Sequence, residues 1–391
     1  MIKLLMTTML LCFFSSAPSF ALEVNQHLKY SFSAFHFDDD SVFLPFEDQD
    51  QQLHDINYRA NLSTSLSAFN FEAHYQLQLL NSQQLDNYID PDNNRLFDFS
   101  SVIDEQNNQL MHHRLDRLSL GYSTATTTTR FGRQAVTWGN GFVFNVMDIF
   151  NPFSPTAIDK EYKPGDDMLY FQLLTEKAAD WQFIHLLRRD NNDDIESEQA
   201  SSAIKLQSTF SSLDIDLLLA RHYRDNIIGL GISQPIKDSL WRFDITHTQL
   251  DSGKSVTSVS TNIDYSWQSL GKNFYCFLEY YHNGFGIRDA SDPLSLSLTT
   301  RLSRGELFAR FRNYLSAGLR IELHPLLNFS PTLINNLDDQ SSLLSLSLDY
   351  SWQQNLNLST QLVSGLGDSQ SEYNGNAAAA DNLTFLLGYY F

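Results

Sequence analysis

Apolar side chains recur at every second position along much of this chain, with polar residues between them. Between residues 56 and 68 the apolar side chains take the even positions, and Arg59, Asn61, Ser63 and Ser65 take odd ones. Successive side chains of an extended strand point to opposite faces, so this spacing predicts a strand with one apolar and one polar face. Residues 71–79 repeat the pattern after a short turn. The two segments together predict a β-hairpin.

The same alternation continues to the end of the chain and predicts an all-β protein. Segments of about ten alternating residues between polar loops are typical of a transmembrane antiparallel β-barrel, in which a closed sheet pairs every backbone N–H and C=O. A barrel of this size encloses an aqueous lumen. Sixteen strands also remain possible, because strand pairs near 225–250 and 300–325 could merge. We predict 18 strands, at 28–34, 56–68, 71–79, 118–122, 129–138, 169–173, 181–187, 204–210, 213–219, 228–232, 241–245, 259–267, 274–280, 307–323, 326–334, 343–352, 354–365 and 381–391.

Short and long connections alternate between these strands. In outer-membrane-type barrels short turns face the periplasm and long loops face outward. With an even strand count, both termini then lie on the periplasmic side. The short connections are 67–70, 211–212, 235–239, 268–272, 324–325 and 353, and the long ones are 38–52, 81–112, 139–167, 190–200, 283–304 and 366–380.

The N-terminal residues form a separate segment. Lys3 is followed by a mostly apolar run, and Ser19-Phe20-Ala21 offers small residues for cleavage. This is the pattern of a secretory signal peptide. We therefore predict a signal peptide at 1–21 and a single barrel domain at 22–391. The exported chain keeps one cysteine, Cys276, so it contains no internal disulfide.

The last strand, 381–391, carries apolar residues at alternate positions and ends on Phe391. It resembles the terminal strand of bacterial outer-membrane β-barrels, whose final Phe belongs to the signal read by the insertion machinery. The resemblance implies location in the cell outer membrane, with membrane lipid, lipopolysaccharide and that machinery as partners. In a closed barrel the neighbour of this strand is the first strand, at 28–34.

Aromatic residues cluster where strands lead into short turns. The sequence Asp-Tyr-Ser-Trp occurs at both 264–267 and 349–352. Amphipathic rings prefer the membrane interface, so we predict a periplasmic aromatic girdle. The repeat itself could be a chance similarity, and the girdle would stand in either case. Its predicted members are Tyr265, Trp267, Tyr350, Trp352, Tyr389 and Phe391.

One stretch is distinctive. Residues 130–168 contain Gly-Arg-Gln at 132–134, Trp-Gly at 138–139 and Asn-Pro at 151–152. With Glu279–Gly286 and Ser371–Tyr373, they resemble a family of porin-like outer-membrane proteins of Gram-negative bacteria. The resemblance covers most of the chain and implies an outer-membrane barrel, without a defined substrate.

The connection 139–167 is too apolar for an exposed loop, so we expect it to fold into the lumen. Charges in a narrow pore set ion preference, which makes this segment a candidate constriction. It could equally be a structural lid with solvated charges. The charged candidates are Asp148, Asp159, Lys160, Glu161, Lys163, Asp166 and Asp167.

Three arginines, Arg310, Arg312 and Arg320, are expected on one face of the strand 307–323. They could form a basic ladder that orients polar solutes in the lumen. We prefer the alternative, in which they form interior salt bridges with Glu306 and Glu322.

The net charge is −20, and loss of Lys3 with the signal peptide makes it −21. Acidic residues concentrate in the connections 38–52 and 190–198, whose spacing does not fit a calcium loop. The chain lacks GxSxG, HExxH and phosphate-loop motifs, so we expect no enzymatic activity, cofactor, metal or nucleic-acid partner. We predict an outer-membrane channel for passive passage of small polar solutes or ions, with a weak cation preference. The alternative is a plugged barrel for surface adhesion, anchoring or assembly.

Overall fold

A computed structural model describes residues 21–37, 49–82, 92–176, 179–190, 192–368, 371–374 and 381–391. The predicted signal peptide lies outside these residues except for Ala21, the first residue of strand β1. Most of the acidic segment 38–52 also lies outside them. Among the described residues, no helix is long and apolar enough to cross a membrane.

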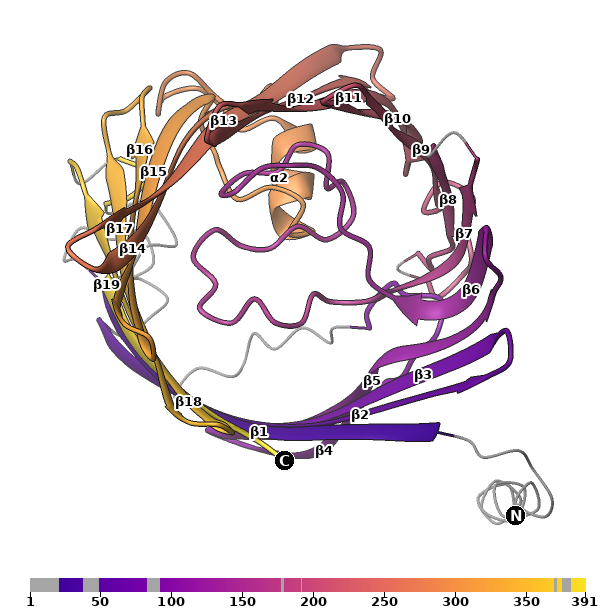
Figure 1. The fold of residues 1–391 in the computed structure, drawn as a ribbon, viewed down its shortest axis with the longest axis horizontal. Helices are drawn as coiled ribbons and strands as arrows, with labels where there is room; N and C mark the ends of the chain where they lie inside the picture. The colour runs from indigo at the N-terminus through magenta and orange to yellow at the C-terminus, as the bar shows by residue number, and fades with distance from the viewer. Residues whose placement is uncertain are drawn as a thin grey trace.

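The strands stand side by side in a closed ring (Figure 1). All neighbouring pairs are antiparallel. The described strands are β1 (Ala21–His36), β2 (Asp50–Leu66), β3 (Phe69–Ser82), β4 (Ser100–Gln106), β5 (Gln109–Ser123), β6 (Thr127–Gln134), β7 (Asp166–Leu174), β8 (Asp180–Leu186), β9 (Ser201–Phe210), β10 (Leu213–His222), β11 (Asp225–Ile236), β12 (Ser239–Gln249), β13 (Ser255–Ser269), β14 (Lys272–His282), β15 (Asn313–His324), β16 (Leu327–Asn336), β17 (Ser342–Gln353), β18 (Leu356–Leu366) and β19 (Asp381–Tyr390).

The closed barrel wall has 18 strands, as predicted. Of the 19 strands in the described residues, β4 pairs only with one end of β5, whose other end pairs with β6 along the same edge. β4 therefore forms a hairpin with one end of β5 and does not add a strand to the closed wall. The alternative count of sixteen is wrong, because β11 and β12 remain separate strands. The expected seam is confirmed: Tyr30 lies opposite Leu387 and Ala34 lies opposite Leu383.

The predicted strand 307–323 is wrong at its start, because β15 begins only at Asn313. The preceding residues belong to a connection that packs inside the ring, where Ala309 and Phe311 are fully buried. The same connection contains the one helix in the described residues, α2 (Leu296–Ser303), which the alternation did not predict. Ser295 caps this helix, its hydroxyl accepting the N–H of Leu298 at 3.3 Å.

The two faces of the sheet differ as a membrane barrel requires. Outward-facing Leu120, Leu219 and Ile228 are each more than half exposed. Such an apolar band is stable only in contact with lipid. Inward-facing positions are polar and include buried charged side chains such as Lys29 and Arg59. The face toward the lumen therefore carries the chemistry.

Residues 135–165, which we call the lumen segment, lie inside the ring together with α2 (Figure 1). Two apolar clusters pack this segment against the wall. Phe144 stacks on Tyr281 of β14 with ring centroids 4.5 Å apart, and Met147 and Phe150 pack in a second cluster with Ile184 of β8. The segment is therefore packed against the wall on two sides of the ring, at β14 and at β8.

Gly132 provides a test of how closely neighbouring strands approach. Its φ is +116°, and an added Cβ would lie 2.1 Å from the carbonyl oxygen of Leu118 on the paired strand. Gly132→Ala combines backbone strain with a clash and should cost on the order of 2–5 kcal/mol. We expect the variant to lose its folded, fast-migrating form at a lower temperature on unboiled gels.

Gly253→Ala is the matched control, because Gly253 has a φ of +80° but an added Cβ meets nothing within 4 Å. It should carry the backbone strain alone. Equal unfolding temperatures for the two variants would show that the contact with Leu118 is unimportant.

Candidate functional site

A wall carboxylate on β12 holds the first part of the lumen segment. Asp244 accepts the backbone N–H of Asn140 at 2.7 Å and its side-chain amide at 2.9 Å. Asn262 on the adjacent β13 donates to the Asn140 carbonyl at 2.9 Å. The backbone N–H, the backbone carbonyl and the side-chain NH2 of this one asparagine thus all bond to the barrel wall.

A second wall carboxylate, Glu279 on β14, binds the backbone directly. It accepts the N–H groups of Phe142, Val143 and Phe144 at 2.6, 3.1 and 2.8 Å, and its side chain is almost completely buried. Successive backbone N–H groups that converge on a carboxylate form an anion-binding nest with charge-assisted hydrogen bonds. This cradle fixes the segment where it crosses the lumen.

The far end of the lumen segment is tied to β1 and β19. Lys29 lies 2.6 Å from both Asp159 and Glu161, and the hydroxyl of Tyr390 donates to Glu161 at 2.9 Å. Between the two acids and the wall, the ring of Tyr162 stacks on His27 at 5.3 Å. Two of the predicted constriction residues, Asp159 and Glu161, are therefore partners of a wall lysine.

The segment is also closed on itself. Lys163 lies 2.5 Å from Asp148 and donates to the carbonyl of Val136 at 2.6 Å. Both charged side chains are about one-twentieth exposed. A buried pair of this kind loses stability when one partner is removed, because the other charge is left unpaired. Lys163, near the end of the segment, thus joins its start at Val136 and its middle at Asp148.

Asp166 and Asp167 lie at the start of β7 and face neighbouring arginines. Asp166 lies 2.7 Å from Arg188, and Asp167 lies 2.9 Å from Arg133. Arg133 also lies 2.6 Å from Asp92 and is fully buried. This arrangement explains the Gly-Arg-Gln motif structurally: its arginine joins three chain segments, and both aspartates are buried in ion pairs.

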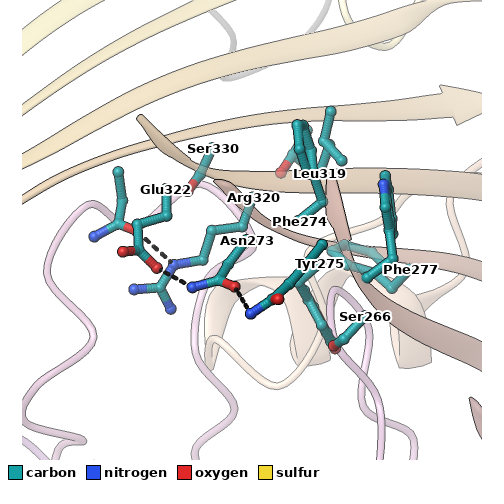
Figure 2. A pocket seen from close by; sticks show the side chains of 13 residues that line it. Ser266, Asn273, Phe274, Tyr275, Phe277, Leu319, Arg320, Glu322 and Ser330 are labelled. Atoms are coloured by element: carbon teal, nitrogen blue, oxygen red, sulfur yellow. Dashed lines mark hydrogen bonds between the residues drawn. The ribbon is translucent and has the colours of Figure 1, made fainter. Parts of the chain in front are cut away.

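The predicted basic ladder is wrong for two of its three arginines. Arg310 and Arg312 precede β15, and Arg312 donates to the carbonyl of Gly286 at 2.9 Å. Arg320 alone lies on β15, facing the lumen beside Glu322 (Figure 2). The two-residue spacing places side chains on one face only within a strand. It gave the wrong position for Arg310 and Arg312 because they lie before the strand begins.

Glu306, the expected salt-bridge partner of those arginines, pairs with other groups. It lies 3.1 Å from His222 and 3.7 Å from each of Arg301 and Arg304. Burial alone would raise the pKa of the Glu306 carboxyl, but the neighbouring His222, Arg301 and Arg304 hold it below its usual value. The preferred salt-bridge alternative is therefore wrong for Glu306, while Glu322 accepts a hydrogen bond from Asn273 at 2.6 Å.

Open space follows the wall beside the lumen segment. At the short-turn end lies a cavity of about 1030 Å³, lined by Arg320, Glu322 and Phe277 (Figure 2). It shares Phe277, Ser330 and Thr332 with a second cavity of about 240 Å³. These two spaces lie next to each other along β14–β18.

Two smaller cavities follow beside the lumen segment, and we call the four neighbouring cavities together the passage. A third cavity of about 150 Å³ shares Phe142, Val143 and Lys160 with the second one. A fourth, of about 50 Å³, lies next to α2 and shares Asp148 and Glu306 with the third. Among the predicted constriction residues, Asp148 and Lys160 are therefore the ones that line this route.

The predicted girdle residues lie near strand ends on the side of the short turns, with Tyr389 and Phe391 at the C-terminal end of β19 opposite Leu356. Tyr265 stacks on Trp267 at 5.8 Å, and Tyr389 stacks on Phe391 at 5.6 Å. Tyr350 and Trp352 are exposed at the end of β17. Their role at the membrane interface stays a prediction.

Sequence reasoning missed Asp244 and Glu279. Each is an acid at an inward position of a strand, and such a residue needs a partner from inside the barrel. Glu279 even falls in a stretch singled out by its resemblance to porin-like proteins. The signal was present, but the alternation does not say which donors would meet the carboxylate.

Glu372 anchors the connection between β18 and β19. Its carboxyl accepts the N–H of Arg310 at 2.7 Å, the hydroxyl of Tyr314 at 2.5 Å and the amide of Asn336 at 2.9 Å. Burial raises the pKa of Glu372 to about 7, and hydrogen bonds from Tyr314 and Arg310 oppose the shift only in part.

Comparison with known proteins gave matches in fold alone. The chain matches no protein-family model and no curated protein sequence. Acinetobacter baumannii OccAB1 is similar, with a TM-score of 0.58 at 8% identity, over 95% of this chain and 96% of that chain. A BenF-like porin from Pseudomonas fluorescens Pf-5 gives 0.56 at 11% identity, over 95% and 98%.

Pseudomonas aeruginosa OccK2 (OpdF), solved in complex with glucuronate, gives a TM-score of 0.54 at 10% identity, over 95% of this chain and 98% of that chain. The likeness extends over nearly the full length of each protein. The expected fold, a closed barrel of 18 antiparallel strands like those of these solved porins, is thereby confirmed.

The raised pKa of Glu372 predicts pH-dependent packing of the connection around it. Because the folded-state value of about 7 exceeds the ordinary 4.5, this group favours packing fully below the ordinary value. That contribution is lost as the pH rises through the folded-state value. We expect trypsin cleavage after Arg310 to increase severalfold from about pH 5.5 to about pH 8.5, relative to Glu372→Gln at each pH.

Glu372→Gln keeps an acceptor oxygen but cannot ionise, so it corrects for the pH dependence of trypsin itself. Glu105→Gln, on the exposed hairpin strand β4, should retain the wild-type profile. Parallel profiles for wild type and Glu372→Gln would contradict the assignment.

Proposed function

We propose that this protein is an outer-membrane channel that passes small polar solutes or ions down their concentration gradients. The observation that carries the proposal is the run of four cavities that share lining residues from the short-turn end to α2. A packing plug would leave isolated voids. Here the lumen segment narrows the route, from about 1030 Å³ to about 50 Å³, beside a polar wall.

The position of the lumen segment supports the same function. Its anchors at Asp244, Glu279 and Lys29 draw it against particular strands and leave space along β14–β18. A rigid constriction of this kind sets the size limit of a pore. We propose that Lys160 and Asp148 lie at its narrow part, with the other charged candidates of the segment acting as anchors.

Charge along the route is nearly balanced, which favours weak ion selectivity. The strongly negative net charge of the chain therefore suggests only a small cation preference. The ionisable lining residues, among those the structure describes, are Asp148, Glu306, Glu322, Asp349, Lys160, His222, Arg301 and Arg320.

The likeness to OccK2, solved with glucuronate, supports a small polar solute as cargo. The channel needs no catalysis. We propose that the C-terminal strand engages the insertion machinery and that the outward face contacts lipid and lipopolysaccharide.

Single-channel recording tests the proposal. Purified protein in a planar bilayer should give stepwise conductance, because we propose that the four neighbouring cavities form one conducting route. Removal of residues 140–160 takes away the narrowing segment and should raise the conductance severalfold, since the widest part of the route then extends through the barrel.

Both proteins are first checked for a heat-dependent shift in gel mobility, which shows that the barrel has folded. Absence of conductance steps from folded wild type and from the folded deletion variant would exclude a channel. That result would favour the alternative, a plugged barrel whose acidic outer loops mediate adhesion, anchoring or assembly.

A further inference from the structure

Three neighbouring strands present a wall of uncharged hydrogen-bonding side chains to the passage. They come in pairs from inward positions of β16, β17 and β18, and Ser330 lies opposite Ser347 while Ser347 lies opposite Gln361. Each hydroxyl can both donate and accept, as can the amide. The members of this wall, which we call the hydroxyl wall, are Ser330, Thr332, Ser345, Ser347, Ser359 and Gln361.

The opposite side of the same cavity is apolar. It is formed by the lumen segment, with Phe142, Val143 and Ile158 among its lining residues. The ring of Phe142 packs on Phe277 of β14 at 4.9 Å, and Tyr275 lies just below it. A solute in this cavity therefore contacts hydroxyls on one side and carbon surface on the other.

Three basic residues of the barrel wall, Lys29, Arg59 and Arg117, do not line this passage. Lys29 is held by Asp159 and Glu161, Arg59 lies 2.7 Å from Asp116, and Arg117 donates to the carbonyl of Lys163. The side chains of Lys29, Arg59 and Arg117 are at most 9% exposed. They fasten the lumen segment and are not available to a carboxylate solute.

The charges that do line the passage compensate one another. Among the described residues, the cavity of about 240 Å³ contains one acid and one base, Asp349 and Lys160. The larger cavity below it contains Arg320 and Glu322. Asp349 already accepts the hydroxyl of Ser359 at 2.6 Å. Neither an anion nor a cation therefore meets an excess of opposite charge.

We propose that the channel selects uncharged polyhydroxylated ring solutes of monosaccharide size, a conclusion that rests on the channel function proposed above. Such a ring has hydroxyls on its edge and C–H groups on its faces. The hydroxyl wall and the apolar lumen segment match these two surfaces. The cavity of 240 Å³ has the volume of about eight waters at ~30 Å³ each, which is room for one small ring.

Uptake of three matched sugars into proteoliposomes tests this proposal. Glucose, glucuronate and glucosamine share one ring and differ in charge. Radiolabelled glucose should enter roughly threefold to tenfold faster than either charged sugar. This ratio corresponds to the net free energy of one ordinary hydrogen bond. Equal rates, or a faster charged sugar, would overturn the selectivity.

The double variant Ser345→Ala/Ser347→Ala removes two hydroxyls of the wall without adding bulk. It should slow glucose by roughly threefold to tenfold and change potassium chloride conductance by a smaller factor, because a small ion needs no matched set of hydroxyls. The matched control is Ser63→Ala/Ser65→Ala, at inward positions on β2 outside this cavity, which should behave as wild type. Conductance with glucose uptake insensitive to the hydroxyl wall overturns this inference alone, whereas absence of conductance and of all uptake overturns the channel function as well.

Discussion

The bilayer leaves backbone N–H and C=O groups no water to bond with, and this constraint determines the architecture. A sheet satisfies it only by closing, so the register between β1 and β19 is as necessary as any pair inside the ring. Closure of the sheet at 18 strands then produces a lumen too wide for wall side chains to fill. The inward-folded connections fill part of this wide lumen. They occupy the space that closure creates, and the polar inner face supplies the groups that hold them.

The wall divides its chemistry by position around the ring. On β1, β2 and β5 the cations Lys29, Arg59 and Arg117 are consumed in holding the lumen segment. On β12 and β14 two carboxylates take its backbone N–H groups. The strands β16–β18 line the cavities with small neutral side chains and, among the described residues, form no hydrogen bond or ion pair with the lumen segment. The open route is thus set by where the wall does not bind the loop, and its neutral character follows from the same division.

The alternation of apolar and polar residues predicted the strands well, because lipid outside and water inside impose the same two-residue period on every strand. It placed all eighteen and the seam between Tyr30 and Leu387. It failed at Arg310 and Arg312, since apolar residues that pack inside the lumen look like those that face lipid. It also could not pair Glu279 with Phe142, because contacts between distant segments depend on how a connection folds, for which no period exists. The apolar character of residues 139–167 nevertheless pointed to the right part of the chain.

The nest around Glu279 binds main-chain N–H groups, which every residue type except proline possesses. Side chains at Phe142 and Val143 are therefore not needed for the attachment itself, although they form one boundary of the open route. Position and lining are separable properties of this segment. Substitutions at those two positions, in evolution or by design, could therefore suit a different solute while the segment stays attached to the wall. The selectivity of the barrel could then change without a change in its fold.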